Sequence, residues 1–232
     1  MDVSLPSLMW LCGAGLVGAL AHVALARRTV AACLATAREE HERELARLQG
    51  LALHDALTGL PNRTLLQDRL CHALSSQSRR GGRVGVLFLD LDGFKAVNDT
   101  YGHGTGDEVL AVIASRLRAS VRGGDTPARL AGDEFVVVCE GVDGPEALAI
   151  AAARIEKAVS APILLGERQI CLGVSLGSVL HGPSIHEPAS HAADRLLAEA
   201  DQAMFEVKRG RQLALAEMGV LNQQAARSVL LA

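Results

Sequence analysis

Two adjacent carboxylates, Asp133 and Glu134, stand out in this 232-residue sequence because of what surrounds them. They follow Arg129-Leu130-Ala131-Gly132 and precede the apolar run Phe135-Val136-Val137-Val138-Cys139. Neighbouring carboxylates repel each other, so a plain core hairpin gains nothing from them. A turn that holds a divalent cation beside a phosphate chain does gain from them, because Mg²⁺ is bound by carboxylates together with substrate phosphates. The pattern therefore predicts a metal-binding turn between two strands.

A second acidic cluster follows a predicted buried strand over residues 83–91. The string Asp90-Leu91-Asp92-Gly93-Phe94-Lys95 stands where this strand emerges, and open α/β sheets bind ligands at such strand ends. Lys95 adds a compact positive charge that suits phosphates. Asn98-Asp99 and the stretch 102–107 then predict a glycine-rich loop that leads into a helix. In this order, the pieces indicate metal-assisted nucleotidyl transfer.

Hydrophobic periodicity predicts the elements that must position these residues. The predicted strands cover residues 83–91, 126–131, 134–139 and 170–180, and the predicted helices cover 105–121, 145–161 and 192–208. The second and third strands form an antiparallel hairpin, and the strands outnumber what a simple β-α-β alternation needs. We therefore expect an α/β sandwich with a mixed, largely antiparallel sheet flanked by helices. Beyond Gly210 no clear structure is predicted, although 214–221 could extend as helix.

The composition excludes some classes of function. The formal net charge is -3, so the sequence gives no argument for a nucleic-acid partner or for an anionic surface. The five cysteines are scattered without any Cys-x-x-Cys, which predicts reduced thiols in a cytoplasmic protein. Three histidines, His181, His186 and His191, match no helix or strand face, so we interpret residues 180–190 as a variable loop.

The N-terminal stretch differs from the rest of the chain. Residues 7–26 are almost wholly apolar and long enough to span a bilayer as a helix. Arg27 and Arg28 follow at once, so the positive-inside rule places everything after them in the cytoplasm. A cleaved signal peptide is the alternative, but no basic region precedes the apolar run. We therefore expect a single-pass transmembrane anchor over residues 1–28.

Residues 29–53 predict one continuous connector helix after this anchor. Leu45, Leu48 and Ala52 recur at a spacing of three and then four residues, which makes a short seam for a partner helix. Two interpretations stay open for this segment: a solvated connector, or a dimerising stalk that transmits an input. The main domain is expected over 54–212, followed by a C-terminal tail over 213–232.

Four separated motifs in the chain resemble those of the GGDEF family, the diguanylate cyclases. They are residues 55–63 (Asp-Ala-Leu-Thr-Gly-Leu-Pro-Asn-Arg), 90–110, 122–135, and 200–205 with Lys208, in the family's order and at ordinary spacing. The resemblance implies a fold related to nucleotide cyclases and polymerase palms. It also implies condensation of two GTP into cyclic di-GMP with release of pyrophosphate. Each protomer would hold one GTP, so the active form would be a homodimer, and the setting would be a bacterial inner membrane with a cytoplasmic catalytic domain.

The resemblance further implies roles for individual residues. Asp90, the backbone carbonyl of Leu91 and Asp133 would bind Mg²⁺ or Mn²⁺. Asp133 or Glu134 would assist deprotonation of the 3′-hydroxyl nucleophile. Asn98 and Asp107 would recognise guanine, with His103 beside the nucleotide. The other implied substrate contacts are Phe94, Lys95, Gly132, Lys208 and Arg211, with Lys95 placed to stabilise transition-state charge.

A second site is implied just upstream of the acidic turn. Arg122-Gly123-Gly124-Asp125 lies five residues before Ala131, at the family's spacing for its product-inhibition motif. An Arg can donate to guanine O6 and N7 while an Asp accepts from the opposite edge. An ordinary surface ion pair is the alternative interpretation.

The chain departs from the family pattern in three places. Ala131 replaces the first glycine of the signature. If that position needs a positive φ, or a close approach of the backbone to phosphate, alanine costs on the order of 1 kcal/mol or more. Lys208 and Arg211 stand one residue closer than usual, and Phe205 replaces a common Tyr. Because the acidic residues are retained, we expect an active cyclase. The alternatives are a catalytically inactive cyclic di-GMP receptor and a pure interaction module.

Overall fold

The computed structural model describes residues 34, 38, 40, 52–80, 82–182 and 187–230, with side chains described except at 78–80 and 215–230. The chain divides into two compact units, Met1–Ala52 and Leu53–Ala232. The predicted anchor over 7–26 lies outside the described residues, as does most of the predicted connector helix over 29–53. Among the helices that are described, none is both long and apolar enough to cross a membrane.

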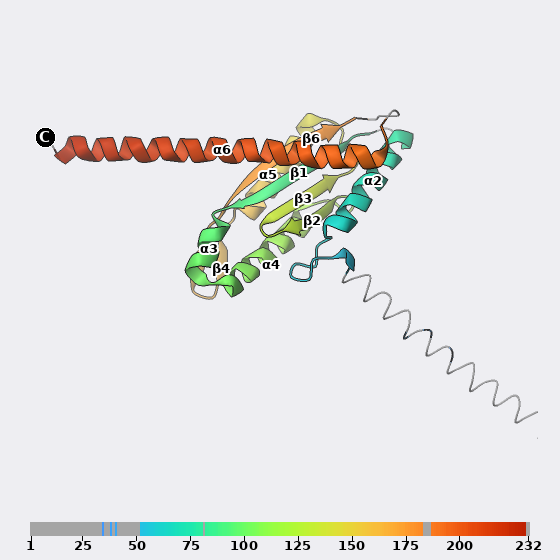
Figure 1. Ribbon diagram of the computed structural model, residues 1–232, viewed down its shortest axis with the longest axis horizontal. Helices are drawn as coiled ribbons and strands as arrows, with labels where there is room; N and C mark the ends of the chain where they lie inside the picture. The colour runs from blue at the N-terminus through green and yellow to red at the C-terminus, as the bar shows by residue number, and fades with distance from the viewer. Residues whose placement is uncertain are drawn as a thin grey trace, which may run out of the picture. The chain divides into compact units, whose positions relative to one another are not determined.

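The second unit is built on a four-stranded antiparallel sheet with helices on both faces (Figure 1). In chain order its elements are α2 (Arg63–Arg80), β1 (Val84–Asp92), α3 (Phe94–Tyr101), α4 (His103–Ser120), β2 (Thr126–Ala131), β3 (Glu134–Cys139), α5 (Pro145–Val159), β4 (Ile163–Leu165), β5 (Arg168–Ile170), β6 (Gly173–His181) and α6 (Ala189–Leu230). The strand order in the sheet is β2-β3-β1-β6, and β4 and β5 form a separate two-stranded sheet.

The central strand β1 fixes where the chemistry-bearing residues lie. It pairs antiparallel with β3 on one side and with β6 on the other. In this register Asp90 lies opposite Glu134 on β3 and opposite Ser175 on β6. The predicted hairpin is confirmed with the same bounds, β2 and β3. The largely antiparallel sheet is also confirmed, but every strand pair in the described part of the chain is antiparallel, so the predicted parallel component is not found there.

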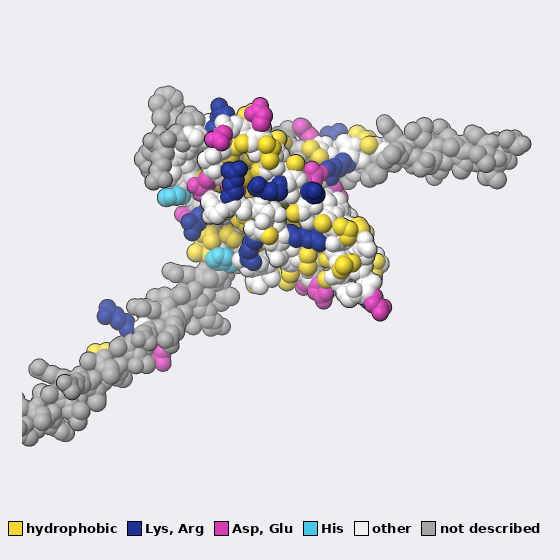
Figure 2. Space-filling model, turned by 180° about the vertical axis from the view of Figure 1, so that it is seen from behind, with side chains coloured by type: hydrophobic (Ala, Val, Ile, Leu, Met, Phe, Trp, Pro, Cys, Tyr) yellow, Lys and Arg dark blue, Asp and Glu magenta, His cyan; other side chains and the backbone are white. Residues whose placement is uncertain are grey.

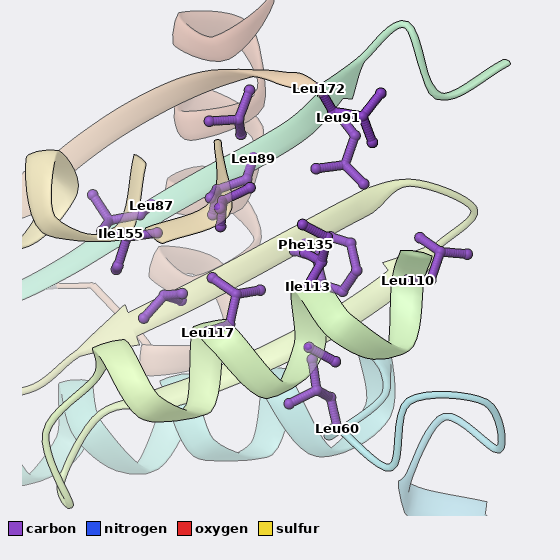
Figure 3. Packing of buried hydrophobic residues seen from close by; sticks show 14 of the residues in the cluster. Leu60, Leu87, Leu89, Leu91, Leu110, Ile113, Leu117, Phe135, Ile155 and Leu172 are labelled. Atoms are coloured by element: carbon purple, nitrogen blue, oxygen red, sulfur yellow. The ribbon is translucent and has the colours of Figure 1, made fainter. Parts of the chain in front are cut away.

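Two apolar cores enclose this sheet, because successive side chains of β1 point to opposite faces. Leu87, Leu89 and Leu91 pack with side chains of α4, α5 and Phe135, as Figure 3 shows for the labelled residues. Val84, Val86 and Phe88 pack on the other face with residues of α2 and α6. A strand that is buried on both faces has little freedom to shift, so β1 is a firm support for the carboxylates at its end.

Several elements differ from those the sequence predicts. The expected strand over 170–180 is two strands, β5 and β6, with Leu172 buried between them. The predicted tail over 213–232 is largely a continuation of α6, which runs to Leu230. No proline follows Pro188, and strong helix formers such as Ala, Leu and Gln are frequent there, which explains the continuation. The helices α2 and α3 were not predicted.

Candidate nucleotide and metal site

Three carboxylates converge at one end of the sheet. Asp90 is on β1 and is 8% exposed. Glu134 is the first residue of β3, the strand next to β1, and is half-buried. Asp133 lies in the turn that joins β2 to β3 and is also half-buried. The hairpin thus brings the acidic pair of the turn to the acidic end of β1, as the sequence predicted.

These carboxylates repel one another within the fold. Burial raises the pKa of Asp133, and the charge of Asp90 raises it further. Burial also raises the pKa of Glu134, with further contributions from Asp201 on α6 and from Asp90. Asp201 is therefore a further acid near this site. The sequence does not indicate that it lies close to Glu134, because the two residues are more than 60 positions apart along the chain. A bound cation would relieve this accumulation of negative charge.

Lys208 supplies one cation to the cluster from α6. Its Nζ donates a hydrogen bond to Asp90 Oδ1 at 2.6 Å. Burial opposes the charge of Lys208, but the hydrogen bond to Asp90 and the nearby charge of Asp133 outweigh it and raise the pKa of Lys208. The ammonium group therefore stands beside Asp90 as a metal cation would, which indicates that the site is built for positive charge.

The donor set fits a hard divalent cation. Asp90 and Asp133 offer carboxylate oxygens, and Leu91 offers a backbone carbonyl between Asp90 and the end of β1. Within the described part of the chain no group of three or more His, Cys, Asp or Glu side chains could hold a metal by itself. Mg²⁺ is typically held by one or two carboxylates that substrate phosphates and water complete, and Asp90 and Asp133 offer that number of carboxylates. The site is therefore suited to a metal that arrives with a nucleotide.

The turn itself accommodates Ala131 without strain. Gly132 has a φ of 50°, which only glycine adopts at low cost, whereas no residue other than glycine has a positive φ in the described chain. Ala131 is the last residue of β2, is exposed, and pairs with Glu134 across the hairpin. The left-handed conformation that would have penalised alanine thus belongs to Gly132, which the chain retains.

Arg129 ties this turn to the beginning of the domain. Its Nε donates to the carbonyl oxygen of Gly132 at 2.9 Å, and its guanidinium also donates to Asp55 Oδ1 at 2.9 Å. Asp55 Oδ1 further accepts hydrogen bonds from the backbone and hydroxyl of Thr58, at 2.8 and 2.6 Å. Burial raises the pKa of Asp55, but these hydrogen bonds and Arg129 outweigh it, and the net effect lowers it. Sequence reasoning did not assign Arg129 or Asp55 to the site.

Asp55→Asn is expected to lower the free energy of unfolding by about 1.5–3 kcal/mol near neutral pH, since a charged hydrogen-bond partner is lost. The folded-state pKa of Asp55 lies below its ordinary value of 3.8. Its stabilisation is therefore present above that value and is lost as the pH falls through the folded pKa. Denaturant unfolding of both proteins as a function of pH measures this.

A matched control for Asp55 is the exposed Asp68 on α2, whose replacement by Asn should change stability little. If the stability gap between the parent chain and Asp55→Asn persisted undiminished in strong acid, the ion pair with Arg129 would not be its source.

The predicted guanine contacts lie on α3 and at the start of α4. Asn98 is half-buried on α3, and its side chain lies against Gly106, the residue before Asp107. Phe94 is buried at the beginning of α3, whereas Lys95 and His103 are exposed. The structure thus brings Asn98 against the residue that precedes Asp107, and it leaves the Lys95 and His103 side chains open to solvent. The predicted glycine-rich loop is instead the first turn of α4.

A cavity of about 590 Å³ lies along α6, next to Lys208. It is lined by Asp92, Gly93, Gly173, Lys208, Arg211, Gln212 and Ala214. Arg211 donates to Asp92 Oδ2 at 3.3 Å, to Glu156 Oε1 at 2.6 Å, and to the carbonyl of Val174. Both predicted basic residues of α6 therefore line one cavity, with Lys208 facing Asp90 and Arg211 linking α6 to α5 and β6.

The predicted second site is a tight turn after α4. The backbone N–H groups of Arg122 and Glu140 donate to the Asp125 carboxylate at 3.0 and 3.3 Å, and the Asp125 N–H donates to the Arg122 carbonyl at 3.0 Å. Arg122 is exposed, and Arg154 on α5 reaches the same end of α4 through a bond to the Ser120 carbonyl. Lys and Arg side chains gather on the face opposite α6 (Figure 2). Because the Arg122 side chain is exposed, this turn presents a guanidinium to solvent, where an anionic ligand can reach it.

Comparison with known proteins gives matches across this unit. The family model described as "Diguanylate cyclase, GGDEF domain" matches residues 52–213. The bifunctional diguanylate cyclase/cyclic di-GMP phosphodiesterase MucR of Pseudomonas aeruginosa is 44% identical over 178 residues, which cover 75% of this chain and 24% of that protein. The diguanylate cyclase TpbB of Pseudomonas aeruginosa is 40% identical over 168 residues, which cover 72% of this chain and 37% of that protein.

A solved structure gives the same match in three dimensions. The coiled coil and GGDEF domain of DgcB from Caulobacter crescentus, in complex with c-di-GMP, superposes with a TM-score of 0.67 at 28% identity, covering 78% of this chain and 95% of that one. The match with this chain spans only 24% and 37% of the length of the two curated relatives.

Proposed function

Because this chain belongs to the GGDEF family, we propose that it condenses two GTP molecules into one cyclic di-GMP and two pyrophosphates. The observation that carries this proposal is the convergence of Asp90, Asp133 and Lys208, since Lys208 bonds to Asp90, acts on the charge of Asp133 and also lines the cavity along α6. Two acids and one cation at a strand end are groups that a metal-assisted attack on a phosphate uses.

The residues divide the work of this reaction. Asp90, Asp133 and the Leu91 carbonyl would hold Mg²⁺ or Mn²⁺, which would polarise the α-phosphate and the 3′-hydroxyl. Lys208 leaves Asp90 and compensates phosphate charge when the nucleotide arrives. Glu134 has a raised pKa and is therefore a better proton acceptor for the 3′-hydroxyl than an ordinary carboxylate.

Two chains must act together in this proposal. Each holds one GTP, with Asn98 and Asp107 recognising guanine and Phe94, Lys95, His103 and Gly132 adjoining the nucleotide. The 3′-hydroxyl of each GTP attacks the α-phosphate of the other, and each attack releases pyrophosphate. The homodimer is thus part of the reaction, because one site alone cannot close the ring.

Product inhibition at Arg122 and Asp125 is part of the proposal. The backbone N–H of Arg122 donates to Asp125, which holds this turn in place, and Arg154 bonds to the Ser120 carbonyl just before it. The DgcB structure contains c-di-GMP, which supports a role for this ligand in the family. The second candidate function is a cyclic di-GMP receptor without turnover. The intact turn with Arg122 and Asp125 supports this function, because it would bind cyclic di-GMP whether or not the chain catalyses a reaction.

Incubation of the purified full-length chain with GTP and Mg²⁺ separates these two functions. The cyclase predicts cyclic di-GMP and pyrophosphate in a ratio of about one to two, with the Arg122→Ala variant relieved of inhibition by added product. A receptor predicts binding of cyclic di-GMP that Arg122→Ala abolishes, with no product. If the chain neither forms nor binds cyclic di-GMP, both functions are excluded and an interaction module is left.

The membrane location is also a proposal. The apolar segment 7–26 followed by Arg27 and Arg28 supports a single-pass anchor with the catalytic unit on the cytoplasmic side. The chain would then stay in bacterial membranes during alkaline carbonate extraction and be released by detergent. Release by carbonate alone would contradict the anchor.

A further inference from the structure

Gly106 and Asn98 meet where α4 crosses the end of α3. A Cβ atom placed on Gly106 would lie 1.9 Å from Asn98 Oδ1 and 3.0 Å from its Cγ. The next nearest atom is Phe94 Cζ, at 3.2 Å. Separations this short are not compatible with a real side chain, so any residue larger than glycine would displace the Asn98 carboxamide. The carboxamide is the far end of a side chain, and it can move without disturbing either backbone.

The backbone gives no reason for a glycine at this position. Gly106 is buried in the first turn of α4, and its φ is not positive. In such a helical position glycine is about 0.5–1 kcal/mol less favourable than alanine. Glycine at position 106 thus lowers the stability of the helix, and the Asn98 side chain occupies the space that a Cβ atom would take.

Resting on the proposed function, we propose that Gly106 is a positioning residue for guanine recognition. It leaves the space in which the Asn98 carboxamide lies, one residue before Asp107 on α4, so that both side chains can address one edge of the base. The guanine edge presents the O6 acceptor together with N–H donors, and an amide next to a carboxylate complements that pattern. Adenine presents a different pattern, and a site built to bond one base rejects the other.

The test compares binding of 3′-deoxy-GTP and 3′-deoxy-ATP to the full-length chain with Mg²⁺ present, because nucleotides without a 3′-hydroxyl cannot condense. Gly106→Ala should weaken the affinity for 3′-deoxy-GTP by about tenfold and leave the affinity for 3′-deoxy-ATP within about twofold of that of the parent chain. The thermal midpoint of Gly106→Ala should stay close to that of the parent chain, because the helix-forming gain of alanine opposes the crowding against Asn98 and Phe94.

A double-mutant cycle assigns the effect to Asn98. In an Asn98→Ala background, the substitution Gly106→Ala should cause no further loss of 3′-deoxy-GTP affinity. Gly104→Ala is the matched control, since it adds a methyl group to the same helical turn where no atom lies within 4 Å. The side-chain amide signals of Asn98 in a nitrogen-proton correlation spectrum should move in Gly106→Ala and stay in Gly104→Ala.

Four results would overturn the inference. Equal weakening by Gly106→Ala with and without Asn98 would show that the methyl group acts through the helix, and so would an equal loss in Gly104→Ala. An unmoved Asn98 amide in Gly106→Ala would remove the steric basis. If the parent chain bound 3′-deoxy-GTP no better than 3′-deoxy-ATP, the proposed function would fail, and this inference with it.

Discussion

Asp133→Asn is expected to lower the rate of cyclic di-GMP formation by on the order of 10²–10³-fold. The carboxylate is one of the two that would hold the cation, and an amide oxygen lacks the charge that a divalent ion requires. The measurement is the initial rate at saturating GTP and Mg²⁺. Asp143→Asn, an exposed residue on a different loop, is the control and should keep the parent rate.

The same substitution should raise the free energy of unfolding when a chelator removes divalent ions. Burial and Asp90 raise the pKa of Asp133 in the folded chain, so its charged form is disfavoured by folding. The contribution of Asp133 to the free energy of unfolding therefore decreases as the pH rises from the ordinary pKa of an aspartate through the higher pKa of Asp133 in the folded chain. Asp133→Asn removes this penalty and should also lose the stabilisation that added Mn²⁺ gives the parent chain. If Asp133→Asn lowered the free energy of unfolding in the absence of metal, the proposed repulsion between Asp133 and Asp90 would be contradicted.

Lys208→Ala is expected to reduce turnover by about 10–100-fold, because a positive charge near the developing phosphate charge is lost. Unlike Asp133→Asn, it should also lower the metal-free free energy of unfolding, by about 1–3 kcal/mol. The reason is that Asp90 is 8% exposed and would lose the partner that lies 2.6 Å away. A higher metal-free stability of Asp133→Asn together with a lower one of Lys208→Ala, both with impaired turnover, would indicate that Lys208 neutralises this acidic cluster.

Arg209→Ala is the matched control for Lys208. It removes one positive charge from the next position of α6, where the side chain is exposed. Both turnover and stability should stay close to those of the parent chain, because exposed charges contribute little. If Arg209→Ala impaired turnover as much as Lys208→Ala, the general charge of α6 would be responsible and the contact with Asp90 would not.

Strong local patterns were predicted well from the sequence. The hairpin β2–β3 is bounded by polar and glycine residues around short apolar runs, and the predicted bounds match those of the structure. The long helices α4 and α5 were found within a few residues for the same reason. The helix α2 was missed although Leu66, Leu70, Ala73 and Leu74 show the spacing of one buried face.

Other features depend on contacts that a sequence does not display. α3 contains Asn98, Asp99 and Thr100, which are weak helix formers, so this stretch looked like a loop. Arg129 and Asp55 are 74 positions apart, and nothing local pairs them. The role of Gly106 depends on where the Asn98 side chain lies, which only the packing of α3 on α4 determines.

The position of Ala131 shows how the structure changes one expectation. The sequence raised the prospect of a strained alanine, because the family signature has glycine there. In the structure the positive φ belongs to Gly132, and Ala131 is an exposed strand residue. The predicted cost therefore does not arise from backbone conformation, and the case for an intact site becomes stronger.

The most direct test of this account is the GTP turnover of the parent chain beside that of Ala131→Gly, both at full length with Mg²⁺. We expect the parent chain to form cyclic di-GMP and the variant to do so within about threefold of its rate, because an exposed methyl group at a position without positive φ is worth well under 1 kcal/mol. Product formed only by Ala131→Gly, with none from the parent chain, would contradict the claim that the natural sequence is an active cyclase.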